Sequence, residues 1–382
     1  MNHYFVTGAS GTVGSAVVPR LLEETAGHIT LLLRAAGAAE LNTRFERLCG
    51  FWGIAPEDPR RARLEILLGD AEAPRFGLTL PAWEKLVQQT THILHCAGKV
   101  RMNLPLAAAR QAAVASARNV VELARACLAR GGFAKVEFVS TVGVGGRLPG
   151  VLPERWITEA RSFHNTYEQS KAEAEDFIRA EVEQGLPLTV HRPSMVVGES
   201  TMGRVIHFQI FYHLCEFLSG RRSFGLFPDL GEARLDIVPV DYVARALVWS
   251  AHQPAMAGRI LHLCSGPQAS LRLMALREEV RRIFRAHGIP VPPSLVLPLS
   301  WVKAAVPLIR AMSPEKTRRA LKTLPVFFDY LGEEQGFANE RSRALLAAEG
   351  IPLPLPESYV ARVLEWYAQH HPTRRANKAA NP

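Results

Sequence analysis

The chain has 382 residues, of which 48% are hydrophobic and 21% are charged. This balance excludes a disordered or fibrous protein, and the length suits two packed lobes. Five cysteines without Cys-x-x-Cys spacing speak against a disulfide framework or a zinc site and favour reduced thiols in a cytoplasmic protein. An apolar run follows Met1 almost at once, so we expect no signal peptide.

The net charge of +9 comes from short basic clusters along the chain rather than from one block. They include Arg221-Arg222, Arg281-Arg282, Arg318-Arg319 and Arg374-Arg375. Each cluster alone reads as a solvated surface, but together they favour anionic ligands: a phosphorylated cofactor, CoA, an acidic carrier protein or an anionic lipid surface. Nucleic acid is not expected, because no groove-reading motif accompanies the clusters.

A glycine-rich turn follows the first predicted strand, His3 to Val6, and precedes a helical pattern of apolar residues. Gly8 permits the tight turn, Gly11 lets the backbone approach a pyrophosphate, and Gly14 lets the helix pack closely on the strand. The start of the helix offers unpaired N–H groups and a positive dipole end to phosphates. This context predicts a dinucleotide site formed by Thr7, Gly8, Ser10, Gly11, Thr12, Val13 and Gly14.

The second predicted strand, Ile29 to Leu33, ends at Arg34. In dinucleotide folds an acidic residue near this position binds the ribose 2′-hydroxyl of NAD, whereas an arginine accommodates the 2′-phosphate of NADP. Arg34 on a basic chain therefore favours NADPH over NADH, although Arg44 could take the same role.

Two further predicted strands complete the cofactor site. The strand over residues 64–68 is followed by Asp70, which either caps a turn or contacts the adenine. The strand over residues 91–95 leads into Ala97 and Gly98, whose small size lets a cofactor pass close to the strand end. We expect all three residues to contact the cofactor.

Four polar side chains form the candidate catalytic set. Ser140 and Thr141 follow the strand over residues 136–139, where a hydroxyl can donate to the oxygen of a reacting carbonyl. Tyr167 and Lys171 lie four residues apart at the start of a predicted helix and share one face. A neighbouring ammonium would lower the pKa of the phenol, ordinarily near ~10, and make it a usable general acid or base. A surface Tyr with a solvated Lys is the alternative.

These motifs together resemble an extended short-chain dehydrogenase/reductase. Further segments are similar to the fatty acyl-CoA reductase and thioester-reductase branch, the male-sterility-like NAD-binding proteins, which includes terminal reductase domains of carboxylic acid reductases and peptide synthetases. They are Gly69-Asp70, Asn165-Thr166-Tyr167, Arg192-Pro193-Ser194 and Asp236 to Val243. The resemblance covers roughly residues 4–265.

The resemblance implies a role for each matching residue. Thr141, with Ser140 as its substitute, would polarise the carbonyl, and Tyr167 would donate the proton. Lys171 would bind the nicotinamide ribose and lower the pKa of Tyr167. The remaining matches would bind cofactor: the glycines of the turn at the pyrophosphate, Arg34 at the 2′-phosphate, Asp70 at the adenine, and Pro193 and Ser194 beside the nicotinamide.

The chain departs from the family pattern at two places. Many relatives have an Asn followed by Gly-Thr where this chain has Ala113 to Ala117, which leaves a proton relay or helix kink there in doubt. The usual aromatic residue after the Ser-Thr pair is replaced by Gly143, which would widen the substrate pocket.

The rest of the chain predicts a second, mostly helical lobe. An apolar helix over residues 208–218 is either the core of this lobe or a lid over an acyl tunnel. The pattern then predicts a strand over 236–240 that returns to the sheet, a helix over 242–250 and a strand over 260–264. Two more helices are predicted over 272–287 and 358–370. A Pro-rich run over 352–356, which cannot be helical, precedes the second of them. Residues 294–312 are apolar but interrupted by Pro, Lys and Arg, which excludes a membrane span. We expect this segment to pack into the helical lobe. Peripheral contact with a membrane is the alternative.

We therefore predict a doubly wound, mostly parallel α/β sheet that binds NADPH, over residues 1–200 and 233–265, and a helical substrate lobe over 201–232 and 266–382. The expected reaction is hydride transfer to the carbonyl of an acyl thioester, giving an aldehyde and then an alcohol if a second transfer follows. No metal is expected. A sterol- or sugar-type alcohol dehydrogenase or epimerase, and a non-catalytic NADP-binding scaffold, are the alternatives. The acyl chain, its carrier and the oligomeric state are not determined by the sequence.

Overall fold

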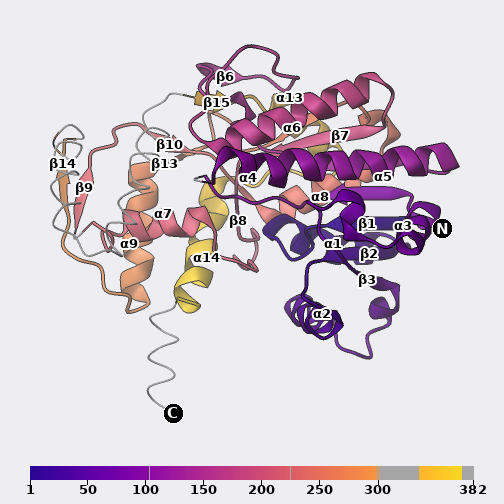
Figure 1. Cartoon of the computed structure of the whole chain (residues 1–382). Helices are drawn as coiled ribbons and strands as arrows, with labels where there is room; N and C mark the ends of the chain where they lie inside the picture. Colours follow the sequence, from indigo (N-terminus) through magenta and orange to yellow (C-terminus); the bar gives the residue numbers. More distant parts are fainter. Residues whose placement is uncertain (103, 224, 299–300, 302–334, 372–382) are drawn as a thin grey trace.

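The computed structural model describes residues 1–102, 104–223, 225–298, 301 and 335–371. Its centre is a seven-stranded sheet in the order β12-β7-β5-β4-β1-β2-β3, in which every neighbouring pair is parallel (Figure 1). The strands are β1 (His3–Thr7), β2 (His28–Leu33), β3 (Leu64–Leu68), β4 (His92–His95), β5 (Lys135–Val139), β7 (Leu188–Pro193) and β12 (Ile260–Leu263).

Helices cover both faces of this sheet, which confirms the doubly wound fold. On one face, α1 (Thr12–Glu24), α2 (Ala38–Trp52) and α8 (Val240–Ala251) bury their apolar residues in a first hydrophobic core. On the other face, α3 (Leu80–Gln89), α5 (Ser116–Arg130) and α6 (Thr166–Glu183) do the same. Continuous apolar runs such as that of β1 form the strands because parallel strands are buried on both sides. The strand order reverses between β1 and β4, the crevice where ligands bind in such sheets.

The helical stretch before β5 is three consecutive pieces. They are α4 (Leu106–Arg110), a π-helical turn (Gln111–Ala115) and α5. A π turn is a common form of helix distortion near functional sites. The helix is therefore distorted by a π turn in a stretch that overlaps residues 113–117, where many relatives have Asn followed by Gly-Thr.

A second hydrophobic core lies apart from the sheet. It is built from α7 (Ile210–Leu218), α9 (Leu273–Ala286) and α14 (Pro356–Gln369), with a cluster of aromatic rings at its centre. Short strand pairs border it: β9 (Leu226–Pro228) with β14 (Leu295–Leu297), and β10 (Arg234–Leu235) with β13 (Leu271–Arg272). Pro356, expected in a non-helical run, is the first residue of α14, a position that tolerates proline.

One predicted strand does not join the large sheet. The segment predicted over 236–240 is β11 (Ile237–Pro239), which pairs with β8 (Met195–Val197) as a separate two-stranded sheet. The prediction was wrong on this point because an apolar strand pattern does not reveal its pairing partner. β12 takes the edge position beside β7 instead.

The described residues 335–351 pack against the sheet region. β15 (Gln335–Phe337) pairs with β6 (Gly150–Leu152), and Leu346 of α13 (Glu340–Ala348) and Ile351 belong to the first core. The division of the chain into two lobes at the bounds given above stays a prediction.

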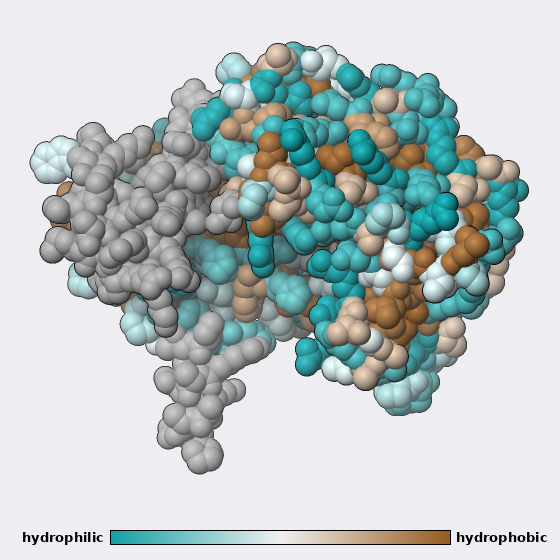
Figure 2. Space-filling model, in the orientation of Figure 1, coloured by the Kyte–Doolittle hydropathy of each residue, from teal (hydrophilic) through white to brown (hydrophobic). Residues whose placement is uncertain are grey.

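On the face seen in Figure 2, hydrophilic residues cover most of the described surface, and apolar residues form separate patches. Within the described part of the chain, no helix combines the length and apolarity that crossing a bilayer requires. The predicted apolar segment 294–312 lies mostly outside the described residues.

Candidate active site

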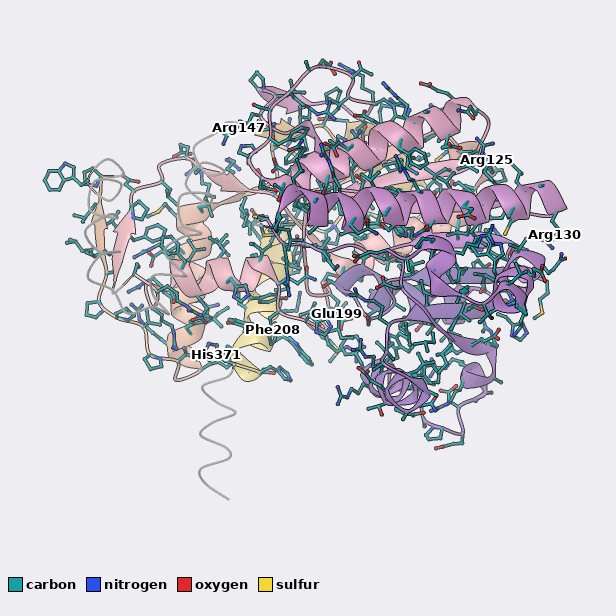
Figure 3. All side chains as sticks on the ribbon, in the orientation of Figure 1. Arg125, Arg130, Arg147, Glu199, Phe208 and His371 are labelled. Carbon is teal, nitrogen blue, oxygen red and sulfur yellow. The ribbon has the colours of Figure 1, made fainter. Side chains whose placement is uncertain are left out.

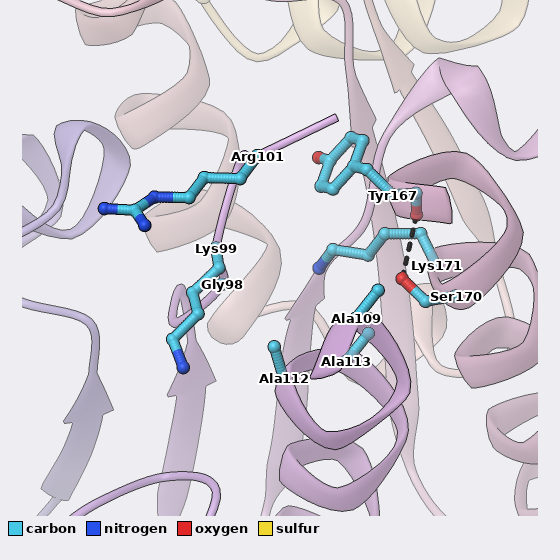
Figure 4. Close-up of a pocket in the computed structure, with 9 residues that line it drawn as sticks. All are labelled: Gly98, Lys99, Arg101, Ala109, Ala112, Ala113, Tyr167, Ser170 and Lys171. Atoms are coloured by element: carbon cyan, nitrogen blue, oxygen red, sulfur yellow. Dashed lines mark hydrogen bonds between the residues drawn. The ribbon is translucent and has the colours of Figure 1, made fainter. Parts of the chain in front are cut away.

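A small cavity lies at the carboxyl ends of the central strands, between the segment that follows β4 and the start of α6 (Figure 4). Its volume is about 10 Å³, the space of one water molecule. It is lined by Gly98, Lys99, Arg101, Ala109, Ala112, Ala113, Tyr167, Ser170 and Lys171. Two of the four predicted catalytic side chains, Tyr167 and Lys171, therefore line one cavity, next to α4 and the π turn that follows it.

Tyr167 stands in the first turn of α6. Asn165 caps this helix, because its side-chain oxygen accepts a hydrogen bond of 3.0 Å from the backbone N–H of Glu168. The Thr141 hydroxyl hydrogen-bonds to the phenol. Burial nevertheless raises the pKa of Tyr167 to about 12. The expected lowering of this pKa by Lys171 is wrong for this arrangement, because desolvation of the phenolate outweighs the opposing contacts.

Lys171 is buried one turn further along α6. Its Nζ donates to the carbonyl oxygen of Val139 at 3.1 Å and lies 5.6 Å from the centroid of the Phe138 ring, so it ties α6 to the end of β5. Burial lowers the pKa of Lys171 to about 8, although Glu175 and Cys96 oppose this shift. A Cβ at Gly98 would lie 3.5 Å from Nζ. Gly98, one of the two small residues predicted at the end of β4, is thus in close contact with the Lys171 amine.

The two predicted hydroxyls have different surroundings. Thr141 begins the turn after β5, where its Oγ1 accepts from the N–H of Gly143 at 3.2 Å while the side chain contacts Tyr167. The Ser140 hydroxyl is buried, and no described residue offers it a hydrogen bond. Thr141 is therefore the hydroxyl that the fold brings to the phenol.

The position of Gly143 does not enlarge the pocket. A Cβ there would lie 3.3 Å from Cγ of Glu168, whose carboxylate accepts from the backbone N–H and ring Nδ1 of His164, both at 3.0 Å. Both side chains are buried. The expectation of a wider substrate pocket was wrong, because Glu168 fills the space beside Gly143.

The glycine turn has the shape needed for a pyrophosphate. Gly8 adopts a φ of +75°, its carbonyl accepts from the N–H of Gly11 at 2.8 Å, and a Cβ at Gly14 would lie 2.2 Å from that same carbonyl oxygen. Thr12 opens α1, and its buried hydroxyl has no hydrogen-bond partner among the described residues. A free N-terminal turn and an unsatisfied buried hydroxyl fit a dinucleotide.

Thr7 and Ala97 join the turn to the neighbouring strand. The Thr7 hydroxyl is 2.8 Å from Nδ1 of His95, and the N–H of Ala97 donates to it at 3.4 Å. A Cβ at Gly8 would lie 2.5 Å from the Ala97 nitrogen. Thr7 therefore holds the crevice between β1 and β4 together. Ser10, which is exposed, and Val13, which is half-buried, lie on the turn and the start of α1.

The residues predicted at the adenosine end form a charged group. Arg34 is 56% exposed, and its Nη1 lies 3.8 Å from Asp70 and 3.7 Å from Glu72. Asp70 also caps a turn, since its Oδ1 accepts from the N–H of Glu72 at 3.0 Å. Lys99 pairs with Glu72 at 2.7 Å. Glu72 and Lys99 were not among the site residues predicted from the sequence. Their charges, next to the predicted residues Asp70 and Gly98, could have indicated them.

Pro193 and Ser194 lie at the carboxyl end of β7 but do not line the cavity of Tyr167. The Ser194 hydroxyl is buried and has no hydrogen-bond partner among the described residues. Nearby, the buried Asp236 carboxylate accepts from the N–H groups of Ser265 and Gly266 at 2.8 and 2.9 Å. Burial raises the pKa of Asp236 to about 6. This network joins the start of β11 to the segment that follows β12.

A buried ion pair anchors the catalytic helix to the sheet. The Arg192 guanidinium of β7 donates to both carboxylate oxygens of Glu175 on α6, with Nε at 3.0 and 3.2 Å. Arg192 is 1% exposed. Removing one partner would leave an unpaired buried charge, so both residues hold α6 in place. Arg192 belongs to a motif identified in the sequence, but the motif does not reveal its ion pair with Glu175.

Comparisons with known proteins identify the family of this chain. The model of the male sterility protein family, a family of NAD-binding domains, matches residues 6–247. The chain belongs to this family. It is a member of the extended short-chain dehydrogenase/reductases and, by family, an NAD(P)-dependent oxidoreductase.

Two curated relatives are much longer than this chain. Glycine betaine reductase ATRR of Emericella nidulans is 29% identical over 78% of this chain and 22% of its own length. The L-2-aminoadipate reductase large subunit of Penicillium chrysogenum is 27% identical over 69% of this chain and 19% of its own. The chain thus spans about a fifth of each of these relatives.

Solved structures match along nearly the whole chain. The terminal R domain of the myxalamid PKS-NRPS pathway has a TM-score of 0.77 and 25% identity, over 97% of this chain and 91% of that one. The thiolation-reductase di-domain of an archaeal non-ribosomal peptide synthetase has a TM-score of 0.73 at 16% identity, over 97% of this chain and 75% of that one. These likenesses extend the shared fold into the second core.

Proposed function

We propose that the protein is an NADPH-dependent reductase of acyl thioesters bound to a carrier protein. One observation carries this proposal: the Tyr167 phenol, the Lys171 amine and the Thr141 hydroxyl converge beside a glycine turn shaped for a dinucleotide. The bound nicotinamide would supply the hydride. The chain's own residues would orient the thioester and manage the proton.

The two hydroxyls would act on the carbonyl oxygen. Thr141 would donate a hydrogen bond that strengthens as negative charge develops on this oxygen. Tyr167 would then transfer its proton to the oxygen, giving a hemithioacetal that collapses to an aldehyde and a free thiol. The Tyr167 phenol, whose pKa burial raises to about 12, would keep its proton at neutral pH until hydride transfer makes the carbonyl oxygen basic enough to take it.

Lys171 would hold the cofactor ribose beside the Tyr167 phenol. Its position at the end of β5 places a cationic group one helical turn from Tyr167. The glycine turn and the unsatisfied Thr12 hydroxyl would bind the pyrophosphate. Arg34 would bind the 2′-phosphate, after exchanging its weak pairing with Asp70 and Glu72 for the phosphate.

The relatives support a carrier-bound substrate over free acyl-CoA. Several matches are reductase domains of peptide or polyketide synthetases, and one solved structure contains a thiolation domain together with the reductase. The net charge of +9 suits an acidic carrier.

The proposal is tested by supplying NADPH with the same acyl group on CoA and on a phosphopantetheinylated carrier protein. We expect NADPH oxidation together with release of free thiol, faster for the carrier-bound form. One NADPH per thiol marks an aldehyde product, and two mark an alcohol. NADPH oxidation with simple ketones or aldehydes but without thiol release would favour the alcohol dehydrogenase alternative. Absence of turnover on any carbonyl would favour the scaffold.

A further inference from the structure

The segment of residues 198–209, which connects β8 to α7, spans the two hydrophobic cores beside the glycine turn. Ile206 packs against the first core. Phe208 packs in the second core, with ring centroids 4.9 Å from Tyr212 and 4.8 Å from Tyr367. Figure 3 labels both ends of this connecting segment, Glu199 toward the sheet and Phe208 beside α14. His207 therefore lies at the joint between the two cores.

Helices on both sides hold the connecting segment in place. The N–H and hydroxyl of Ser200 donate to the Asp241 carboxylate of α8 at 2.8 and 2.6 Å. A Cβ at Gly203, whose φ is +71°, would lie 2.2 Å from the Arg362 carbonyl oxygen of α14. The Arg204 guanidinium stands 4.7 Å from the ring centroid of Phe51 on α2. The position of His207 is thus set by contacts outside the glycine turn.

His207 reaches the glycine turn directly. Its Nε2 lies 3.1 Å from the carbonyl oxygen of Ser10. A carbonyl oxygen only accepts, so Nε2 carries the hydrogen and donates it. The side chain is exposed, and on the same turn the hydroxyl of Thr12, 7% exposed as a residue, has no partner among the described residues. An N–H donor therefore reaches the turn at Ser10, two residues before the unsatisfied hydroxyl of Thr12.

We propose that His207 is a further cofactor-binding residue, a proposal that rests on the proposed function. When the dinucleotide occupies the turn, the Nε2–H group exchanges the Ser10 carbonyl for a phosphate oxygen. The diphosphate is then bound from α1 on one side and from the connecting segment on the other. Because this segment joins both cores, cofactor binding also stabilises their mutual arrangement.

The test compares NADPH affinity in the wild type, His207→Ala, His207→Gln and the control His213→Ala, an exposed histidine of α7. We expect His207→Ala to raise the Kd for NADPH about tenfold, the effect of one hydrogen bond to a charged acceptor. The amide N–H of His207→Gln should restore most of the affinity, and His213→Ala should match the wild type. Adenosine 2′-monophosphate, which lacks the diphosphate, should bind the wild type and His207→Ala equally.

Four outcomes overturn the proposal. The first is an unchanged NADPH affinity in His207→Ala, including the case where only its melting temperature falls. The second is an equal loss for adenosine 2′-monophosphate, which would mean that His207 shapes the turn rather than binding the diphosphate. The third is a Gln variant as weak as the Ala variant. The fourth is a wild type that binds neither NADPH nor NADH, and this last result alone also overturns the proposed function.

Discussion

The sheet region and the second core achieve burial in different ways. In the sheet region, seven parallel strands of four to six residues are covered on both faces, and neighbouring elements in space are often neighbours in sequence. The second core brings together α7, α9 and α14, which are separated by long stretches of chain, and its strands have two or three residues. The first region is therefore a contiguous frame whose strand ends carry the candidate site, and the second core depends on helices brought together from distant parts of the chain.

The largest expected effect is a loss of kcat, which we expect from a change in the sheet region and not from a matched change in the second core. Tyr167→Phe should lower kcat by about 10²–10⁴-fold because the general acid is lost, with NADPH affinity and melting temperature unchanged. The control is Tyr359→Phe in the second core, which removes a buried hydroxyl bonded to the Ile237 carbonyl at 3.1 Å; it should lower stability by about 1 kcal/mol and leave kcat intact. Equal kcat values for Tyr167→Phe and the wild type would refute the acid role.

The second prediction tests whether the sheet region and the second core unfold separately. Phe5 and Phe284 are both fully buried, one in β1 and the other in α9. Replacing either with Ala should cost about 3–5 kcal/mol of the free energy of unfolding of its own region. Urea titrations should show that Phe284→Ala still binds NADPH after its second core has melted, whereas Phe5→Ala loses both together. Coincident loss of binding and structure in both variants would mean one cooperative unit.

The third prediction concerns pH and gives opposite signs for activity and stability. Lys171 has a pKa of about 8 in the fold against an ordinary value of 10.5. Above pH 8 the folded state loses this proton, so kcat should fall by about tenfold per pH unit. Between these two values the unfolded state binds more protons, so the free energy of unfolding should rise with pH. Lys171→Met should remove the rise, as measured by urea titration; a wild type whose stability does not rise across this window would contradict the buried ammonium.

The smallest expected effect concerns cofactor choice. Arg34→Gln should weaken NADPH binding about tenfold and leave NADH binding unchanged, because the guanidinium is the charge nearest the predicted 2′-phosphate position. Glu72→Gln should do the reverse and favour NADPH slightly, since it removes a carboxylate that competes for Arg34 at 3.7 Å. Kd values for both cofactors decide this. Parallel changes for NADPH and NADH would show that Arg34 does not read the 2′-phosphate.

The sequence by itself determined the features whose cause is local. Strands, the glycine turn before α1 and the helix that carries Tyr167 and Lys171 follow from apolar runs, glycine spacing and a four-residue interval. These patterns depend on backbone geometry over a few residues. The structure places the predicted strands of the sheet and most helices within a few residues of their expected bounds.

The tertiary structure decided what depends on distant neighbours. Only the packed fold reveals that burial raises the pKa of Tyr167, that Glu168 fills the space beside Gly143, and that β11 pairs with β8 rather than with the large sheet. The pairing of Arg34 with Glu72 and the contact of His207 with Ser10 belong to the same class. Desolvation, strand pairing and charge contacts are set by residues far apart in the chain, so a local pattern does not contain them.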